Sequence, residues 1–429
     1  MSEQPSFPIP ETAPADRTTQ TTGRYIVTFR EDAVTEGLAV LSDQAGITGL
    51  ANAADFPHSA LDFSQLEAGG GAVFPTLGVA VVSLDGGGVS SIMTSAGEDS
   101  AILAIEPERI FYAIEEGLSL DYLRGYRDAV DNLYEQATTT ERPESKKLEC
   151  FADDIEFTWG LKATKVNNSL LTGSGIKVAV LDTGMDLLHP DFAGRSIVSE
   201  SFVPGEAVQD GNSHGTHCIG TACGFKDLNG RRYGIAYEST IYVGKVLSNA
   251  GSGDSGWILA GMEWAIANGC QVISMSLGNT TRTSSTAYET VGRRALQNGC
   301  LIVAAAGNNG RTGGTVGQPA NSPSIMAVGA IDNCLAVANF SAKAGKSRGA
   351  KVDIAAPGVD IYSSVPMQQE RYAAYNGTSM ATPHVAGLAA LYAESTGKRG
   401  SQLWQLLTSQ ALPLGLPSAS VGSGLVQAP

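Results

Sequence analysis

The stretch Lys177-Val-Ala-Val-Leu-Asp-Thr-Gly184 is an apolar run that ends in a polar turn. Short, almost uninterrupted apolar runs are typical of parallel strands that are buried on both faces. Four more such runs, at 240–246, 272–275, 301–305 and 325–328, alternate with helical stretches at 255–268, 286–298 and 379–395. This alternation predicts an α/β fold with a doubly wound parallel sheet, whose active site lies at the carboxyl ends of the strands.

Short polar motifs follow several of these strands or lie between them. In chain order they are L-D-T-G at 181–184, H-G-T-H at 214–217, S-L-G at 276–278, A-A-A-G-N at 304–308 and G-T-S-M-A at 377–381. The carboxyl ends of parallel strands meet at one edge of a sheet. We therefore expect these motifs to converge there, provided that the helix holding Ser379 lies alongside.

The motifs and their order resemble those of the subtilisin-like serine proteases, the subtilases. The resemblance runs almost continuously from Phe157 to Tyr392, and it includes S-H-G-T-H-C-I-G-T, A-P-G and N-G-T-S-M-A-T-P-H-V-A-G. The family places its catalytic residues in the order Asp, His, Ser, and the matching residues here are Asp182, His214 and Ser379. The resemblance implies a subtilisin-like catalytic domain over residues 157–429 and a serine endopeptidase that is made as an autoprocessed zymogen.

These residue types meet the needs of acyl transfer, which requires a nucleophile, a base and a group that orients the base. Ser379 would attack the scissile carbonyl, and His214 would take its proton and return it to the leaving amine. Asp182 would hold the imidazole tautomer and stabilise the imidazolium. Asn308 would donate its side-chain N–H to the oxyanion, together with the backbone N–H of Ser379 at a helix N-terminus.

Each motif also has a simpler interpretation. G-T-S-M-A alone would suit a small-residue helix packed on the sheet, and it nearly fits the G-x-S-x-G of α/β-hydrolases. Those enzymes need a histidine after the acid, but the only histidine after Ser379 is His384, five residues on in the same helix. H-G-T-H could hold zinc at i and i+3, yet the chain has 5 histidines and a zinc site needs further ligands. We interpret His189, His217 and His384 as buried structural residues.

Two other classes of function compete with a protease. An inert relative that serves as a binding scaffold is disfavoured because all four catalytic positions are filled. A nucleotide-binding protein is suggested by Gly173-Ser-Gly175, but these glycines precede the strand at 177–181, whereas a dinucleotide site needs them after it. Fluorophosphonate labelling of Ser379 distinguishes an enzyme from a scaffold.

The resemblance further implies a groove for peptide or protein substrates. Its two walls would be Gly251-Ser252-Gly253 and Ser276-Leu277-Gly278, which match segments that pair with an extended peptide main chain. Gly317 matches the base of the primary specificity pocket, where a glycine leaves room for a large side chain. With no acidic residue obviously lining this pocket, we expect large apolar residues before the cleaved bond. Asn279 departs from the glycine usual in the family and would narrow the pocket rim.

Calcium, as a structural ion, is also implied by the resemblance. Carboxylate, amide and carbonyl oxygens are the hard donors that calcium prefers. The implied ligands are Asp191, Asp227 and Asn229 for one site, and Asp353 with the carbonyl groups of Pro323 and Ile325 for a second. Surface loops with Asx turns contain the same residue types. An Asx turn that binds no ion is therefore the alternative interpretation of each predicted calcium site.

Residues 23–114 have the pattern of a small α+β domain. Their elements alternate as β-α-β-β-α-β, the split βαβ order of a ferredoxin-like domain. The predicted strands are at 25–29, 72–75, 78–84 and 102–114, the last interrupted at Pro107, and the predicted helices are at 32–44 and 88–95. The unit resembles the propeptide inhibitor of subtilases. That resemblance implies an intramolecular inhibitor that packs on the protease, assists folding and blocks the cleft until cleavage.

The remaining segments are predicted to be connections. Residues 1–22 contain four prolines and no apolar stretch, so we interpret them as a disordered leader and not as a signal peptide. Residues 115–156 combine apolar residues at helical spacing with many charges, which predicts a helical, acidic linker made of an exposed amphipathic helix and then a polar stretch at 138–149. The processing site is expected between residues 114 and 157.

Charge and cysteine content narrow the partners and the compartment. A net charge of −15 argues against nucleic acid and anionic membranes as partners. No apolar run approaches the roughly 18 residues of a transmembrane helix. The 6 cysteines form no C-x-x-C pair and are expected to be mostly buried free thiols, with one bridge left open. Free thiols and the missing signal favour the cytoplasm, and another export route is left open.

Overall fold

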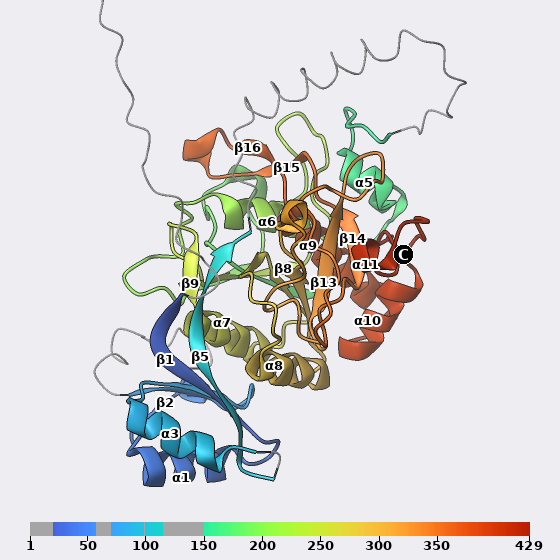
Figure 1. The fold of residues 1–429 in the computed structure, drawn as a ribbon. Helices are drawn as coiled ribbons and strands as arrows, with labels where there is room; N and C mark the ends of the chain where they lie inside the picture. The colour runs from blue at the N-terminus through green and yellow to red at the C-terminus, as the bar shows by residue number, and fades with distance from the viewer. Residues whose placement is uncertain (1–19, 57–69, 98, 115–149) are drawn as a thin grey trace, which may run out of the picture.

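A seven-stranded sheet forms the centre of the computed structural model, in the order β14-β13-β12-β10-β6-β8-β7 (Figure 1). All its neighbouring strands are parallel. The strands are β6 (Lys177–Asp182), β7 (Ile197–Ser201), β8 (Thr240–Lys245), β10 (Val272–Met275), β12 (Leu301–Ala305), β13 (Met326–Ile331) and β14 (Ile354–Pro357). The structure describes residues 20–56, 70–97, 99–114 and 150–429, so most of the predicted leader and most of the predicted linker lie outside the described residues.

Helices cover both faces of this sheet. The main ones are α6 (His214–Cys223), α7 (Ser255–Ala267), α8 (Thr286–Gln297), α9 (Thr378–Thr396) and α10 (Gly400–Ser409). In β6, Val178 and Val180 pack in one core with residues of α6 and α9, whereas Ala179 and Leu181 pack in another with residues of α7 and α8. Because both faces are buried, the strands need apolar residues at every position. The predicted doubly wound α/β fold is confirmed.

Shorter elements complete residues 150–429. They are α5 (Trp159–Ala163), η2 (Val166–Asn168), η3 (Pro190–Phe192), η4 (Gly310–Thr312), η5 (Met367–Gln369) and α11 (Ser418–Val421). The hairpin of β15 (Ile361–Ser364) and β16 (Tyr372–Tyr375) packs beside α6, where the His217 ring stacks on Tyr375 with 4.5 Å between ring centroids.

The N-terminal unit has a ferredoxin-like strand order, β5-β1-β4-β3, extended by β2. Its elements are β1 (Thr21–Phe29), α1 (Val34–Ala45), β2 (Ala51–Asn52), η1 (Ala53–Asp55), β3 (Gly71–Phe74), β4 (Val79–Val82), α3 (Gly86–Ser95) and β5 (Ile102–Ala113). Strand and helix residues, among them Val27, Phe29, Leu41 and Ile92, form a separate small core.

Two details of this unit differ from the prediction. β1 begins at Thr21, inside the segment expected to be a disordered leader. β5 continues through Pro107, which lies opposite Tyr25 beside a register shift in β1. The ladder is already irregular there, so it tolerates a residue that has no N–H to donate.

β5 joins the two parts of the molecule. Beyond the N-terminal unit it pairs antiparallel with β9 (Ser252–Asp254) and with β11 (Leu277–Gly278). In Figure 1 it runs upward from the small unit into the larger one and ends near the carboxyl edge of the parallel sheet. Ile114, the last described residue of the N-terminal unit, thus lies at the edge where the polar motifs were expected to converge.

The cysteines correct one expectation. Cys150 and Cys334 form a disulfide across 184 residues, while Cys218, Cys223, Cys270 and Cys300 are free and buried. Disulfides persist mainly in oxidising compartments. The bridge therefore removes the argument from free thiols for a reducing compartment.

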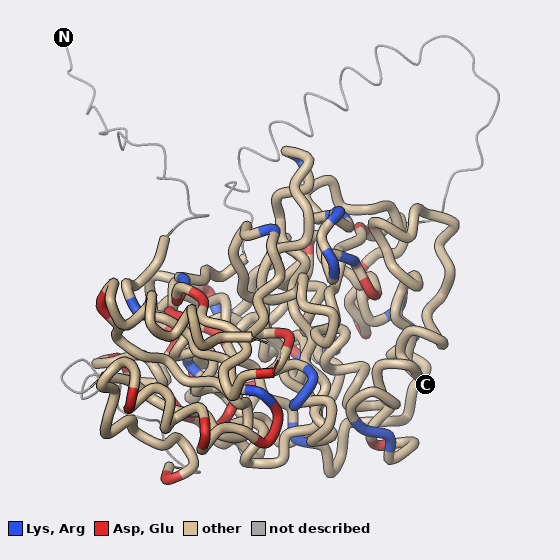
Figure 2. The backbone as a smooth tube through the Cα atoms, turned by 60° about the horizontal axis from the view of Figure 1, so that its bottom comes forward, with Lys and Arg blue, Asp and Glu red and all other residues tan. Residues whose placement is uncertain are grey.

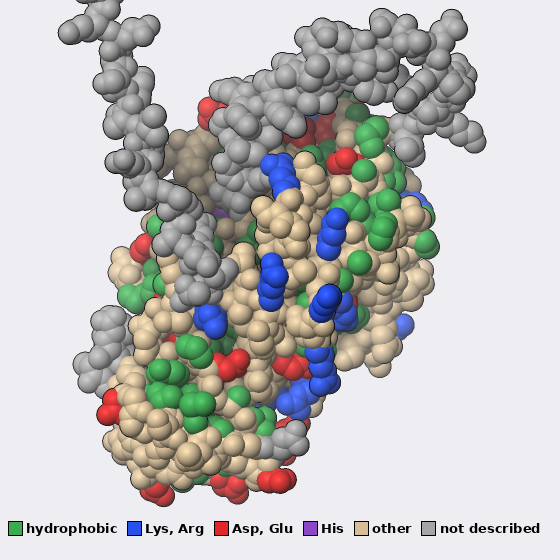
Figure 3. All heavy atoms as spheres, in the orientation of Figure 1, with side chains coloured by type: hydrophobic (Ala, Val, Ile, Leu, Met, Phe, Trp, Pro, Cys, Tyr) green, Lys and Arg blue, Asp and Glu red, His purple; other side chains and the backbone are tan. Residues whose placement is uncertain are grey.

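Surface charge is spread unevenly over the face seen in Figure 3. Acidic side chains lie along the lower end, over the N-terminal unit, and Lys and Arg side chains are scattered over the larger part above it. Among the helices of the described residues, none combines the length and the apolar composition needed to cross a membrane.

Candidate active site

The carboxylate that ends β6 binds the first residue of α6. Asp182 Oδ1 accepts a hydrogen bond of 2.7 Å from His214 Nδ1 and another of 2.8 Å from the backbone N–H of Thr183. Both side chains are buried, so water does not compete for this bond. The proton on Nδ1 leaves Nε2 as the basic nitrogen of the neutral ring. Among the described residues, nothing hydrogen-bonds to His214 Nε2.

Asp182 also determines the charge state of His214. Burial by itself would lower the pKa of the imidazole, but the adjacent Asp182 carboxylate raises this pKa well above its ordinary value. A base with a raised pKa is neutral, and able to take a proton, only at correspondingly higher pH. The geometry therefore suits catalysis on the alkaline side of neutrality.

A second carboxylate, Asp210, holds the end of β6 against the start of α6. It accepts hydrogen bonds from the Thr183 hydroxyl at 2.9 Å, from the backbone N–H groups of Ser213 and Thr216 at 2.9 Å each, and from the Thr216 hydroxyl at 2.7 Å. An anion at a helix N-terminus satisfies N–H groups that the helix leaves unpaired. Asp210 thereby fixes the relative position of Asp182 and His214.

Lys245 supports the same turn from beneath. Its fully buried ammonium group donates to the Thr183 carbonyl at 2.6 Å and to Asn249 Oδ1 at 2.9 Å, and it lies 3.2 Å from a Glu206 carboxylate oxygen. Sequence reasoning overlooked Asp210 and Lys245. The sequence signal for Asp210 is its position four residues before His214, the first residue of α6.

Ser379 is the second residue of α9, at the helix end where backbone N–H groups are unpaired. Its hydroxyl lies 2.7 Å from the carbonyl oxygen of Ile114 and 3.0 Å from that of Ser276. Among the described residues, no hydrogen bond joins this hydroxyl to His214. The serine thus contacts the last described residue of the N-terminal unit and not the base.

Asn308 reaches the same carbonyl group from the turn after β12. Its Oδ1 accepts from the backbone N–H of Thr378 at 2.9 Å and from the Thr378 hydroxyl at 3.0 Å. An amide oxygen that takes two donors must turn its NH₂ the other way. Asn308 Nδ2 accordingly donates to the Ile114 carbonyl oxygen at 3.1 Å.

We expect Asn308→Ala to lower kcat by about 10²–10³-fold with little change in KM, because this donor is most useful when the carbonyl oxygen becomes an anion. Steady-state kinetics on a short peptide substrate measure both constants. The neighbouring Asn309→Ala is the matched control, since the Asn309 amide donates to the Thr315 carbonyl instead. An unchanged kcat in Asn308→Ala would rule out the oxyanion role.

The two predicted groove segments enclose residues 110–114. Tyr112 pairs with Ser252 on one side and with Gly278 on the other, and Phe111 pairs with Gly253. Two further main-chain bonds extend the ladder toward Ser379, from the Ala113 N–H to the Gly251 carbonyl at 2.9 Å and from the Ile114 N–H to the Ser276 carbonyl at 3.3 Å. An extended chain between two strands is the arrangement of a peptide bound by strand addition.

The glycines around Ile114 are required by close approach. A Cβ added to Gly278 would lie 2.8 Å from Ile114 Cδ1, and one added to Gly377 would lie 3.0 Å from the Ile114 carbonyl oxygen. At Gly317 an added Cβ would overlap the carbonyl oxygen of Asn279. The backbone approach of Asn279 thus accounts for a glycine at 317, and the role of Gly317 as a pocket floor stays a prediction.

Comparison with known proteins agrees with this geometry. The Subtilase family model matches residues 173–424, which is more than half of the chain. The chain belongs to the subtilase family.

Several relatives of this subtilase carry names that state their activity. Subtilisin from Bacillus pumilus is 45% identical over 271 residues, which are 62% of this chain and 94% of that protein. Subtilisin E from Bacillus subtilis (strain 168) is also 45% identical over 271 residues, 62% of this chain and 68% of the relative. M-protease from Shouchella clausii (strain KSM-K16) is 39% identical over 340 residues, 78% of this chain and 85% of the relative. The subtilase is a serine endopeptidase.

Two other histidines among the described residues, His217 and His384, have structural partners. His217 Nε2 lies 2.8 Å from the Ile361 carbonyl oxygen, and burial lowers the pKa of this ring to about 3. His384 Nδ1 lies 2.8 Å from the Met380 carbonyl oxygen, and burial lowers its pKa to about 4. Both rings stay neutral near pH 7, and His214 and His217 have separate partners, which does not favour the zinc interpretation of H-G-T-H.

Cys218 lies beside Asp182 and His214. Its Sγ is 3.9 Å from His214 Nδ1, and together with Asp182 these residues place potential metal ligands within 4.8 Å of one another. His214 Nδ1 is already committed to Asp182, and burial raises the pKa of the Cys218 thiol, so the sulfur stays protonated. The hydrogen bond between Asp182 and His214 therefore does not need a metal ion to account for it.

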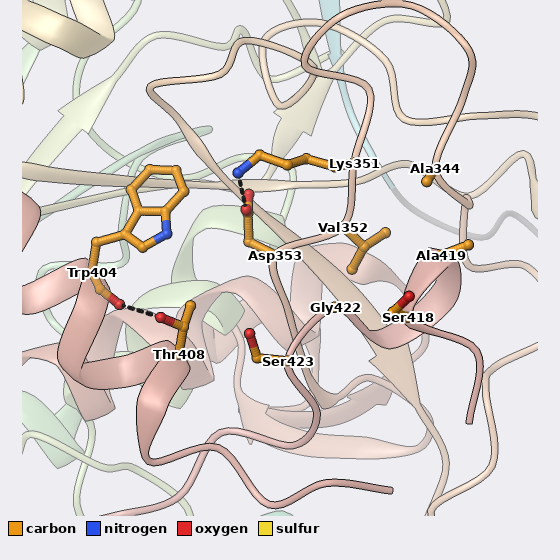
Figure 4. A pocket seen from close by; sticks show the side chains of 10 residues that line it. All are labelled: Ala344, Lys351, Val352, Asp353, Trp404, Thr408, Ser418, Ala419, Gly422 and Ser423. Carbon is orange, nitrogen blue, oxygen red and sulfur yellow. Dashed lines mark hydrogen bonds and ion pairs between the residues drawn. The ribbon is translucent and has the colours of Figure 1, made fainter. Parts of the chain in front are cut away.

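The family resemblance implied calcium, so the predicted ligands need a test of fit. The three carboxylates concerned each lie against a cationic side chain: Asp191 against Arg371 at 2.9 Å, Asp227 against Arg231 at 3.4 Å, and Asp353 against Lys351. Figure 4 shows the last pair on the wall of a pocket that Trp404 and Thr408 also line. Asp353 Oδ2 further accepts from the N–H of Ala327 at 2.9 Å, and Ala327 follows Pro323 and Ile325 closely in the chain. At the other predicted site, Asn229 is exposed. These neighbours do not fit a calcium ion.

Proposed function

We propose that the subtilase is an autoprocessed zymogen in which Asp182, His214 and Ser379, assisted by Asn308, cut the Ile114–Glu115 bond and afterwards peptide substrates. One observation carries this proposal. The Ile114 carbonyl oxygen lies 2.7 Å from Ser379 Oγ and 3.1 Å from Asn308 Nδ2, at the end of a chain held like a substrate. Processing at this bond would turn residues 20–114 from a covalent part of the chain into a bound product.

The steps of the reaction follow from these positions. His214 Nε2 takes the proton of the Ser379 hydroxyl as the oxygen attacks the carbonyl carbon, and Asp182 stabilises the imidazolium that forms. The carbonyl oxygen becomes an anion while Asn308 Nδ2 donates to it. The imidazolium then gives its proton to the leaving amine, and water completes the hydrolysis of the acyl-enzyme by the same route. The hydroxyl must first turn from the Ile114 oxygen toward His214.

The contacts of β5 support latency before and after the cut. Glu108 is fully buried, and its Oε1 accepts from the Gly256 N–H at 2.7 Å in the first turn of α7. Glu106 accepts from the Ser285 hydroxyl at 3.0 Å and from the Ala287 N–H at 2.9 Å at the start of α8. Two acidic side chains of the N-terminal unit thus satisfy the N-termini of two helices of the catalytic unit, where negative charge is favoured.

Contacts also run in the opposite direction across this interface. Glu263 accepts from the N–H groups of Thr76 and Leu77 at 3.1 Å each, and Arg294 donates to the Pro75 carbonyl at 3.2 Å. At the exposed edge, Arg293 pairs with Glu31 at 2.7 Å. Figure 2 shows charged residues of both signs close together where the two units meet. Such reciprocal contacts suit an inhibitor that recognises one specific protease.

Substrate preference follows from the residue that Ser379 faces. Ile114 is apolar, and its Cδ1 packs against the Cα of Gly278 so closely that any Cβ there would collide with it. We infer a preference for large apolar residues before the cleaved bond.

Because calcium ions would meet Arg371, Arg231 and Lys351 at the predicted ligands, we do not assign calcium to those residues.

We expect isolated residues 20–114, which have a core of their own, to inhibit the processed enzyme at concentrations near that of the enzyme. The reason is that Ile114 and the β5 ladder would occupy the groove that a substrate needs. Glu106→Ala should raise the inhibition constant by about tenfold or more, since it removes two charge-assisted hydrogen bonds. The measurement is a titration of activity on a small peptide substrate.

Glu36→Ala is the matched control for this titration. Glu36 is exposed and pairs with Arg30 within the N-terminal unit, so its loss should leave the inhibition constant unchanged. If the wild-type fragment, in large excess, leaves activity intact, the inhibitor proposal fails and the N-terminal unit is at most a folding aid.

A further inference from the structure

We propose that a cluster of arginine and tyrosine side chains takes the place of calcium in this subtilase, so that its stability does not depend on the ion. The cluster consists of Asp191, Asp227, Arg231, Tyr233, Tyr362, Arg371 and Tyr372. It includes two of the carboxylates that the family resemblance assigned to calcium, and each has a guanidinium group in the place where a cation would be needed.

At the first carboxylate both oxygens bind protein donors, three in all. Asp191 Oδ1 accepts from Arg371 Nη2 at 2.9 Å, and Oδ2 accepts from the Tyr233 hydroxyl at 2.8 Å. The Tyr372 hydroxyl lies 3.0 Å from Oδ1 and 2.9 Å from Oδ2. A carboxylate has about four lone-pair sites, and calcium needs 6–8 oxygen ligands. The ion would have to displace these donors and lie beside a positive charge.

The second carboxylate is satisfied in the same way. Asp227 Oδ1 accepts from the N–H groups of Asn229 and Arg231 at 2.9 Å each, and Oδ2 accepts from the Tyr362 hydroxyl at 3.1 Å. The Arg231 guanidinium lies 3.4 Å from Oδ2 and also pairs with Asp153 at 3.2 Å. In the loop at 225–230, both carboxylate oxygens of Asp227 therefore face protein donors, and one of them lies beside the Arg231 guanidinium.

Tyrosine rings connect the two carboxylates into one unit. Tyr362 and Tyr372 stack with ring centroids 5.3 Å apart, and the Tyr233 ring meets both edge-on. Burial, and then the charge of Asp191, raise the pKa of Tyr233 and of Tyr372. Both phenols therefore stay protonated and act as donors over the working range of a protease. The Arg231 guanidinium lies 4.1 Å from the centre of the Tyr362 ring, an additional cation–π contact.

The backbone is shaped to present Arg371. Glu370 and Arg371 have φ values of 71° and 68°, a left-handed conformation that is unfavourable for residues other than glycine. His189 holds this turn, since its Nε2 lies 3.1 Å from the Arg371 carbonyl oxygen while its Nδ1 accepts from the Asp191 N–H at 3.3 Å. Asp191 and Arg371 are thus positioned by the same histidine.

The cluster fastens segments that are far apart in the sequence. It joins η3, the loop at 225–234, the segment around Asp153 and the β15–β16 hairpin. That hairpin packs on α6, where the Ser363 hydroxyl donates to the His217 carbonyl at 2.8 Å. An internal ion pair therefore secures the surroundings of the helix that carries His214. The same principle recurs outside the cluster at Asp353, where Lys351 supplies the cation.

The test is a thermal melt of the full-length chain carrying Ser379→Ala, which prevents autolysis, in excess EDTA and in millimolar calcium. We expect the two midpoints to agree within about 1 °C, whereas a saturated structural ion would separate them by about 5 °C or more. Adding Arg371→Met should lower both midpoints by about 5 °C or more, because it leaves a buried carboxylate without its cation. Arg371→Lys should lower them less.

Two further measurements decide the matter if Arg371→Met fails to fold. Terbium, a calcium analogue, luminesces when tyrosines close to it are excited, so an ion in the cluster would give a strong signal. We expect that terbium gives no luminescence that added calcium abolishes. A competed signal that Tyr372→Phe removes, or a midpoint that falls in EDTA and returns with calcium, would overturn the proposal. The control is Arg293→Met, which breaks an exposed pair and should leave the midpoint unchanged.

Discussion

Ser379→Ala should lower kcat by about 10⁶-fold and leave the full-length chain uncut at Ile114–Glu115. The loss of the nucleophile in subtilisin costs about 2 × 10⁶ in kcat, and the hydroxyl here is the group that lies 2.7 Å from the Ile114 carbonyl oxygen. The alanine variant keeps Asn308 and the groove, so it should still bind the segment at 110–114. Mass spectrometry of the purified protein over time gives both results, because the wild-type chain should release a fragment that ends at Ile114.

Ser274→Ala is the matched control for this experiment. Ser274 lies in β10, is fully buried, and its hydroxyl has no hydrogen-bond partner among the described residues. Its variant should process at the wild-type rate. Processing of Ser379→Ala in the absence of other proteases would show that Ser379 is not the nucleophile. If the wild-type fragment ends at another residue, the assignment of Ser379 as nucleophile stands, but Ile114 is not the residue before the cleaved bond.

The central sheet was predictable because its strands carry their own signal. A strand such as β6, buried on both faces, needs apolar residues throughout, and a polar residue at its carboxyl end must therefore serve the edge of the sheet. Asp182 and Asn308 were selected as candidates in this way. β7 and β14 were not predicted as strands, since β7 is only partly buried and β14 lies in the A-A-P-G stretch, which does not form a clear apolar run.

Contacts between distant segments were not predictable from the sequence. The pairing of Asp191 with Arg371, of Glu106 with Ser285, and of Cys150 with Cys334 joins residues about 180 positions apart. Each depends on how loops and the N-terminal unit lie on the sheet. The family resemblance implied calcium at Asp191, where the fold brings in a guanidinium group. Family motifs indicate the fold and the candidate residues of the site, but they do not show which side chains from distant segments contact a loop.

Asp182→Asn should lower kcat/KM by about 10⁴-fold and move the acid limb of its pH profile to lower pH. The loss follows from the missing charge opposite the imidazolium, and removal of the acid alone in subtilisin costs about 3 × 10⁴ in kcat. In this structure Asp182 Oδ1 accepts from both His214 and Thr183, while Oδ2 has no partner among the described residues. An asparagine can keep its oxygen toward both donors, so the His214 tautomer should be retained and the charge alone is lost.

The direction of the pH shift follows from the two causes that act on His214. Burial lowers the pKa of the imidazole and the Asp182 carboxylate raises it, with the net effect upward. His214 accepts a proton only when neutral, so wild-type activity should rise with pH through a pKa above the ordinary value of about 6.5. In Asp182→Asn burial still lowers the pKa of His214, but no carboxylate raises it. The acid limb should therefore lie at lower pH than in the wild type. Profiles of kcat/KM over about pH 5–10 measure it, with Asp332→Asn as a control because Asp332 only accepts backbone N–H groups in a turn. An acid limb that stays in place after Asp182→Asn would mean that another group sets the charge of the base.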